Sequence, residues 1–170
     1  MIGLKTRELV LMAIFTSILF VSQVALGFLP NVEVVSLLII LYTIHFRKKV
    51  FFIIYGFVLL EGLLYGFGLW WISYLYLWSI LAVITLCFKK QTSVLFWSFL
   101  SGVFGITFGA LCALPYLVLS GVKAAFAYWV AGLLYDIPHC IGNVIVCFLL
   151  FKPLDKLIGK AVYSEQYNNE

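Results

Sequence analysis

The sequence predicts an all-α membrane protein that folds as one compact bundle of six transmembrane helices. Of its 170 residues, 65% are hydrophobic and 11% are charged, and the mean hydropathy is +1.14. A soluble domain has about a quarter of its residues charged, so this composition excludes a soluble enzyme, a nucleic-acid-binding module and a disordered regulator. A span needs about 20 residues, so six spans use roughly 120 and leave room only for short loops within one integral-membrane domain.

Apolar runs separated by polar or glycine-containing turns define the six expected spans. These runs cover residues 8–28, 32–46, 50–66, 69–88, 93–119 and 124–151. The second run ends at Arg47-Lys48-Lys49, a turn around Gly66-Phe67-Gly68 divides the third from the fourth, and a turn over 120–123 divides the fifth from the sixth. The first run continues for about 20 residues without a small-x-small cleavage site near its end, so we interpret it as a retained helix and not as a signal peptide.

The basic residues predict the orientation of this bundle. One side of the expected topology carries Lys5, Arg7, Arg47, Lys48, Lys49, Lys89, Lys90, Lys152, Lys156 and Lys160. The opposite side carries Lys123. Because Lys and Arg are retained on the cytoplasmic side of a membrane protein, we expect both the N- and the C-terminus to be cytoplasmic.

Three acidic residues fall in the outer half of the expected bundle. Glu33 begins the second span, Glu61 lies about one turn before the outer end of the third, and Asp136 lies about three turns into the sixth. A carboxylate in hydrocarbon costs several kcal/mol by most estimates, so such residues usually face a cavity, a partner or a ligand. We expect the three to share one outward-opening pocket.

Aromatic residues gather in the same half of the bundle. Trp71, Tyr74 and Trp78 lie in the first half of the fourth span, and Trp129 lies in the outer half of the sixth. An interfacial aromatic belt explains such residues equally well, although Trp78 is too deep for a belt. Rings with acidic groups among them suit a flat heterocycle that is held by stacking and oriented by polar contacts.

The densest polar stretch runs from Tyr135 to Asn143 in the sixth span. Asp136, His139 and Asn143 stand at i, i+3 and i+7, hence on one helix face. Two interpretations stay open for this face. It either contributes to a ligand site, which we favour, or it clamps the sixth span to the rest of the bundle.

Two groups of small residues predict close helix packing. Gly102, Gly105 and Gly109 form a stripe in the fifth span, which we interpret as an internal contact. Ala13 and Ser17 form a small-xxx-small pair in the cytoplasmic half of the first span. That pair is either a second internal contact or a flat surface on which the helix of a partner docks.

The chain resembles the substrate-binding S components of energy-coupling factor (ECF) vitamin transporters over nearly its whole length. The segments that carry the resemblance are Leu29-Pro30-Asn31-Val32-Glu33, Tyr135-Asp136-Ile137-Pro138-His139-Cys140-Ile141-Gly142-Asn143 and Leu150-Phe151-Lys152-Pro153-Leu154. The first span also resembles the docking helix of this family, whose alanine-xxx-alanine pattern meets the coupling subunit. Here Ser17 stands at the second alanine position.

The resemblance implies a substrate-capture subunit of an ABC importer in a bacterial cell membrane. Such a chain is not an enzyme and needs no cofactor or metal, and the sequence has no Walker A pattern. The implied partners are a membrane coupling subunit and two ATPase subunits. The implied substrate is a small water-soluble vitamin or heterocyclic precursor, and the carboxylates favour a neutral or cationic one.

Two other classes of protein remain as alternatives. A stand-alone facilitator would need a continuous polar path, yet residues 144–150 are apolar. An intramembrane metal-dependent hydrolase would use residues such as His139 and Asp136, but a catalytic metal usually needs three protein ligands. The second histidine, His45, belongs to the opposite end of the bundle.

Overall fold

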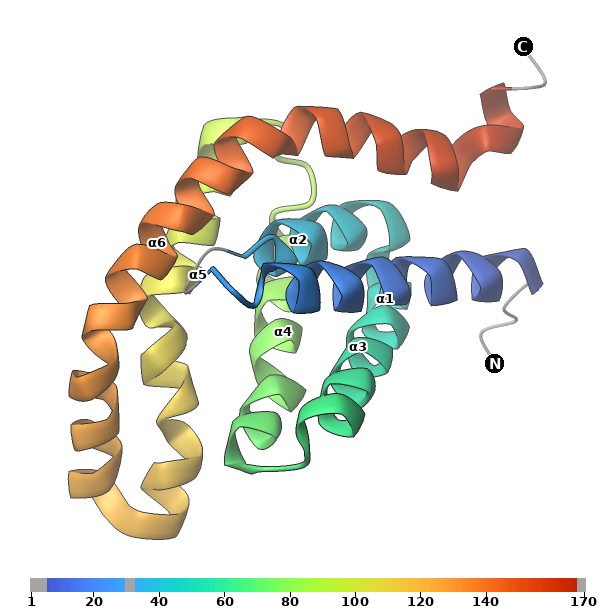
Figure 1. Ribbon diagram of the computed structural model, residues 1–170. Helices are drawn as coiled ribbons and strands as arrows, with labels where there is room; N and C mark the ends of the chain where they lie inside the picture. Colours follow the sequence, from blue (N-terminus) through green and yellow to red (C-terminus); the bar gives the residue numbers. More distant parts are fainter. Residues whose placement is uncertain (1–5, 30–32, 168–170) are drawn as a thin grey trace.

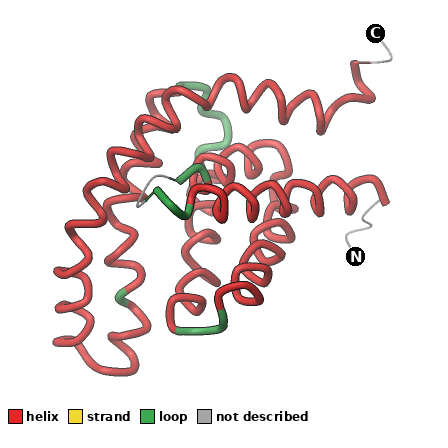
Figure 2. The backbone as a smooth tube through the Cα atoms, viewed as in Figure 1, coloured by secondary structure: helices red, strands yellow, loops and turns green. Residues whose placement is uncertain are grey.

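The computed structural model describes residues 6–29 and 33–167, with side chains described as far as Tyr163. The helices are α1 (Thr6–Leu26), α2 (Val35–Phe46), the 3-10 turn η1 (Arg47–Lys49), α3 (Val50–Tyr65), α4 (Leu69–Cys87), α5 (Val94–Cys112) and α6 (Leu114–Tyr167). Short loops join them, and the described part of the chain has no strand (Figures 1 and 2). Lys5 and the segment 30–32 of the first resemblance motif lie outside the described residues.

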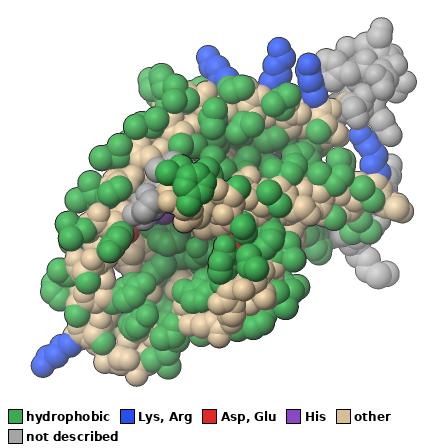
Figure 3. Space-filling view, viewed as in Figure 1, with side chains coloured by type: hydrophobic (Ala, Val, Ile, Leu, Met, Phe, Trp, Pro, Cys, Tyr) green, Lys and Arg blue, Asp and Glu red, His purple; other side chains and the backbone are tan. Residues whose placement is uncertain are grey.

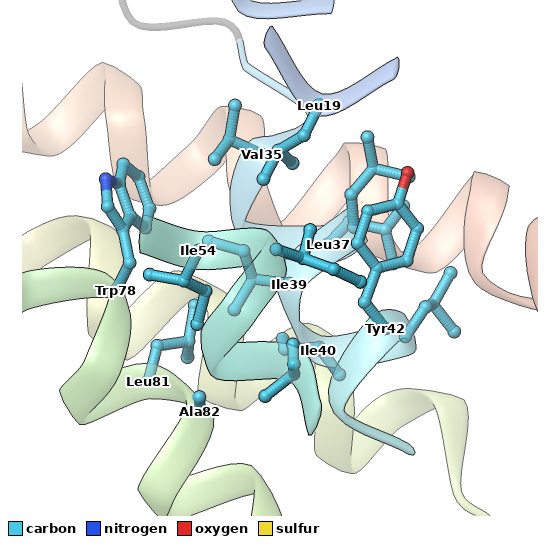
Figure 4. Close-up of a cluster of buried hydrophobic side chains, with 14 of the residues drawn as sticks. Leu19, Val35, Leu37, Ile39, Ile40, Tyr42, Ile54, Trp78, Leu81 and Ala82 are labelled. Atoms are coloured by element: carbon cyan, nitrogen blue, oxygen red, sulfur yellow. The ribbon is translucent and has the colours of Figure 1, made fainter. Parts of the chain in front are cut away.

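Helix α2 lies at the centre of the fold. Every residue from Val35 to Thr43 is buried, so this helix has no exposed face along that length. It contacts each of α1, α3, α4, α5 and α6. In Figure 4 its side chains meet Leu19 of α1, Ile54 of α3 and Trp78 of α4 within one cluster. A helix that is apolar on all sides is stable in a protein core or in lipid, and here other helices cover it.

Helix α1 covers α2 and α3 with one stripe of its surface. Met12, Phe15 and Leu19 are buried, and Phe15 packs edge-on against Tyr42 of α2 with ring centroids 4.9 Å apart. The opposite face of α1 is exposed and carries large apolar residues such as Leu9, Ile14 and Val21. Such a face suits a lipid environment.

Helices α5 and α6 form a closely packed antiparallel pair, drawn in yellow and orange in Figure 1. The glycine stripe makes this approach possible. A Cβ atom on Gly105 would stand 2.9 Å from the backbone nitrogen of Cys140, and one on Gly102 would stand 2.5 Å from Val144 Cγ2. The stripe is therefore an internal helix contact, as the sequence predicts.

The expected count of six spans is not confirmed. Within the described ranges, four helices are long and apolar enough to cross a membrane, namely Thr6–Leu26, Leu69–Cys87, Val94–Cys112 and Leu114–Tyr163. Helix α2 has 12 residues and α3 has 16, so both are shorter than a usual span. Apolar composition predicted both segments as spans, but composition does not distinguish a membrane-facing helix from one buried inside the protein, as α2 is. Helix α3 has an exposed apolar face, with Leu59 and Leu63 at least half exposed, and differs from the expectation in its length.

The boundary between the last two expected spans is also corrected. Helix α5 ends at Cys112 and not at residue 119, and α6 begins at Leu114 and not at residue 124. The reversal extends from Ala113 to Gly121, whose φ of 83° and ψ of 176° break the helical geometry. Glycine tolerates this conformation without a steric penalty. Residues 114–120, which the apolar pattern places in the fifth span and the turn after it, form a short helical segment across the reversal.

Several cationic segments gather at one end of the molecule. The start of α1, the α2–α3 connection, the α4–α5 loop and the end of α6 all lie toward the upper and right side of Figure 1. Figure 3 shows Lys and Arg side chains along this edge and again at the opposite corner, near the α5–α6 turn. The N-terminal end of α1 and the C-terminal end of α6 therefore lie on the same side of the molecule.

The α5–α6 contact leads to a prediction about stability. In Gly105→Ala the new methyl group meets the backbone of α6, which cannot move aside as a side chain can, so we expect a loss of about 1–3 kcal/mol in the free energy of unfolding. Gly132→Ala is the matched control on α6, because its Cβ meets no atom within 4 Å. Alanine there should be neutral or gain up to about 1 kcal/mol from helix propensity. Denaturant unfolding of both variants in one detergent measures the difference, and equal stability would contradict this packing.

Candidate functional site

A cavity of about 540 Å³ opens between the end of α1, helix α4 and the α5–α6 pair. From the chain near α1 and α2 it is lined by Gln23, Leu26, Gly27, Leu29 and Glu33. From α4 and α5 it is lined by Tyr74, Trp78, Phe108, Gly109 and Cys112, and from α6 by Tyr128, Ala131, Gly132, Tyr135, Asp136 and His139. Its volume lies within the range of small-molecule binding sites.

Asp136 is the carboxylate of α6 in this cavity, and it is 4% exposed. Its Oδ1 accepts a hydrogen bond from the backbone N–H of Gly109 (3.1 Å). Its Oδ2 is buried and has no hydrogen-bond partner among the described residues. A buried acceptor without a donor costs about 1–3 kcal/mol, and more when it is charged. Asp136 is therefore a position at which a donor from a ligand would be strongly stabilised.

Gly109 is required for this placement of Asp136. A Cβ atom at residue 109 would stand 2.4 Å from Oδ2 and 2.9 Å from Oδ1 of Asp136. Any larger residue would have to displace the carboxylate. The last glycine of the stripe thus serves the site as well as the helix contact.

Glu33 and His139 join the beginning of α2 to α6. The Nε2 atom of His139 donates to Oε1 of Glu33 (3.2 Å), since an ionised carboxylate can only accept. Glu33 also accepts hydrogen bonds from the backbone N–H and the hydroxyl of Ser36 in the first turn of α2. A carboxylate is favourable at a helix N-terminus, where the N–H groups lack intrahelical partners. This pair therefore holds one wall of the cavity to another.

Asn143 continues this connection one turn deeper and does not line the cavity. Its Nδ2 donates to Ser36 Oγ (3.3 Å) and to the backbone oxygen of Ser101 in α5 (3.2 Å). It thereby links α2, α5 and α6. The polar face predicted on the sixth span therefore has two roles. Asp136 and His139 line the cavity, as expected for a ligand site. Asn143 clamps the helices beneath the cavity, as expected for a structural contact.

One side of the cavity is aromatic. Tyr74 and Trp78 of α4 pack edge-on with centroids 5.4 Å apart, and Phe108 of α5 lies 5.8 Å from Trp78 and 5.0 Å from the His139 ring. Trp78 is 2% exposed, and among the described residues its Nε1 has no hydrogen-bond partner. These rings provide flat apolar surface beside Asp136.

Besides Asn143, three residues expected in the pocket lie elsewhere. Glu61 is buried in α3, and a Cβ on the next residue, Gly62, would collide with the rings of Phe67 and Trp71. Trp71 donates from Nε1 to the backbone oxygen of Val58 (2.9 Å), so it fastens α4 to α3. Trp129 is 37% exposed on the outer surface of α6 and packs against Phe126. The sequence gives the position of each residue along its helix, but not the rotation of the helix about its own axis.

Sequence reasoning did not select Tyr128 or Phe108 for the site, although both line the cavity. A signal for Tyr128 exists in the sequence. Counting back from Asp136 in steps of four reaches Gly132 and Tyr128, which stand on one helix face. Trp129 is one position further and points away from that face. No comparable signal marks Phe108.

Comparison of the chain with protein-family models, with curated proteins and with solved structures finds no match.

A double-mutant cycle measures how strongly Glu33 and His139 hold the cavity together. Glu33→Gln, His139→Gln and the double variant should show a coupling of about 1–3 kcal/mol in the free energy of unfolding, because the two side chains are largely buried and in direct contact. The control cycle is Glu8→Gln with Lys49→Gln, an ion pair whose side chains are about one-third exposed. It should give less than about 1 kcal/mol. Coupling at Glu33 no larger than in the control cycle would show that this pair does not organise the site.

Proposed function

We propose that this protein is the substrate-capture subunit of an ECF-type importer and binds a small, water-soluble, vitamin-like heterocycle in the 540 Å³ cavity. The observation that carries this proposal is Asp136, a carboxylate of the cavity wall whose buried Oδ2 accepts no hydrogen bond from the described residues, together with the rings of Trp78 and Phe108 that line the same cavity. An acceptor next to aromatic faces suits a flat solute with an N–H or ammonium donor. The acidic groups Glu33 and Asp136 disfavour a polyanion.

The proposal includes six membrane spans with both termini in the cytoplasm and a location in a bacterial cell membrane. Two of the six, α2 and α3, would be short spans, of which α2 is covered by the other helices and α3 keeps an exposed apolar face. The cationic segments at one end of the molecule support this orientation through the positive-inside rule. The cavity would then face outward, because it lies at the other end of α1 from Arg7.

The packing below the cavity supports capture over conduction. Trp97 is fully buried and stacks on Phe151 of α6 with an interplanar angle of 10°. Cys147, one turn above Phe151, is also fully buried. This apolar packing, together with the α2 core, leaves no polar path of the kind a stand-alone facilitator requires along the described residues of α6.

Transport would require a membrane coupling subunit and two ATPase subunits. The exposed face of α1 offers a place for the coupling subunit, because Ala13 and Ser17 are exposed and line a shallow groove together with Ile14, Ile18 and Val21. The hydroxyl of Ser17 donates to the backbone oxygen of Ala13 (3.0 Å), so the side chain lies close to its own helix. Small residues allow two helices to approach closely in lipid.

Native mass spectrometry of the gently purified full-length protein tests the proposed function. We expect one small molecule to co-purify at a ratio of one per chain and to be released from the Asp136→Asn variant. Uptake into proteoliposomes by this chain alone, without ATPase subunits, would instead identify a facilitator.

The two buried carboxylates give a matched test of where the solute binds. Asp136→Asn removes the charge from the cavity and should weaken binding of the co-purified solute at least thirty-fold, since truncating one partner of a buried charged hydrogen bond costs about 2–5 kcal/mol. Glu61→Gln makes the same change in a buried carboxylate that does not line the cavity, so affinity should change by less than about threefold, equivalent to under 1 kcal/mol. Calorimetric titration of the two variants measures both values. A larger loss at Glu61 than at Asp136 would contradict the assigned site.

The docking surface on α1 is tested separately from binding. Ala13→Leu combined with Ser17→Leu should abolish co-purification with the coupling subunits and stop uptake in cells, because the added side chains prevent close helix approach. Solute affinity should stay near that of the native protein, since neither residue lines the cavity. Ala127→Leu, an equally small-to-large change on the exposed surface of α6, is the control and should leave assembly intact. Loss of solute binding with assembly preserved would exclude α1 as the docking helix.

A further inference from the structure

A second cavity, of about 1120 Å³, lies at the other end of α1, between the start of that helix, η1, the end of α4 and the last part of α6. Its walls are tied together by side-chain contacts. Nε2 of His45 and Oδ1 of Asp155 are 2.8 Å apart, and the hydroxyl of Tyr163 donates to the backbone oxygen of His45 (3.3 Å). The end of α6 is therefore fixed against the end of α2 and closes one side of this cavity.

Cationic side chains dominate the polar lining. Arg7, Arg47, Lys48, Lys49 and Lys89 all line the cavity, and Glu8 is the acidic residue among the lining side chains that the structure describes. Lys49 is paired with Glu8. Within the described chain, Arg47, Lys48 and Lys89 have no ion-pair partner. Three like charges directed to one cavity repel one another unless an anion binds among them.

The backbone at Arg47 is an independent sign that this side chain is needed here. Arg47 has a φ of 55°, and no other described residue except glycine has a positive φ. Its N–H donates to the backbone oxygen of Thr43 and so ends α2. Glycine would adopt this conformation at lower cost, so an arginine here holds strain that is typical of functional positions.

The other walls of the cavity are apolar and continue onto the outside of the helices. Leu11 and Leu86 are partly buried, whereas Phe52 and Val83 are about half exposed. The cavity is thus cationic on one side and opens along an apolar surface of α3 and α4. A free phosphate would use only the first of these features. A molecule with an anionic head and hydrocarbon tails would use both.

We propose that this cavity binds one anionic phospholipid. Arg47, Lys48 and Lys89 hold the phosphate and the charged headgroup by charge-assisted hydrogen bonds, and the acyl chains lie along Phe52 and Val83. Basic pockets between membrane helices bind anionic headgroups in this manner. The inference does not depend on what the 540 Å³ cavity binds, and it holds for any function of this membrane protein.

The test is native mass spectrometry of the full-length protein from micelles that contain equal amounts of phosphatidylglycerol and phosphatidylcholine. The native protein should retain phosphatidylglycerol in preference, one molecule per chain. The triple variant Arg47→Gln, Lys48→Gln, Lys89→Gln should lose that preference by about tenfold or more. The control variant Lys152→Gln, Lys156→Gln, Lys160→Gln removes the same charge from exposed positions of α6 that do not line this cavity, and it should keep the preference within about twofold.

Thermal unfolding in phosphatidylcholine checks that both triple variants are folded. If the Arg47, Lys48 and Lys89 triple variant is unfolded, the single variant Lys89→Gln replaces it. Lys89 is at an exposed position just after α4, and this variant should lower the preference for phosphatidylglycerol about threefold. Retained preference in the cavity variants, or an equal loss in both triple variants, would overturn the site. Displacement of the lipid by millimolar inorganic phosphate, or by a soluble acidic peptide, would overturn the assignment to a phospholipid.

Discussion

The complete burial of α2 is the constraint on which the rest of the structure depends. A 12-residue apolar helix with no exposed face from Val35 to Thr43 must be surrounded, and five helices contact it. Its first turn is fixed by Glu33, which accepts a hydrogen bond from the backbone N–H of Ser36 and forms a pair with His139. This carboxylate therefore positions the central helix and one wall of the cavity with a single group.

The α5–α6 pair shows how packing and site chemistry share the same residues. Gly102 and Gly105 bring the two backbones together, and Gly109 continues the stripe to the point where Asp136 enters the cavity. The gap left by the missing side chain is filled by the carboxylate, whose Oδ1 bonds to the Gly109 N–H. Oδ2 has no such bond among the described residues, and a buried acceptor left without a donor is costly. Functional sites commonly carry such a cost.

The two cavities divide the molecule electrostatically along α1. Acidic and aromatic groups line the one at the end of this helix, and cationic groups line the one at its start. The exposed face between them carries Ala13 and Ser17 among large apolar residues. In the proposed orientation, this arrangement would present different chemistry to the two aqueous phases and an apolar surface to lipid. Solute capture, lipid binding and partner docking would then use separate surfaces and would be separable by mutation.

Composition and helical period are local properties of the chain, so they predicted the all-helical class with apolar helices able to span a membrane, the glycine contact and the shared face of Asp136 and His139. They did not determine that α2 is enclosed, that the α5–α6 turn begins at Ala113, or that Glu61, Trp71 and Trp129 lie away from the cavity while Tyr128 and Phe108 line it. Depth in a membrane follows from position along the chain. The direction in which a side chain points depends on how each helix is rotated against its neighbours, and only the tertiary packing around α2 decides that.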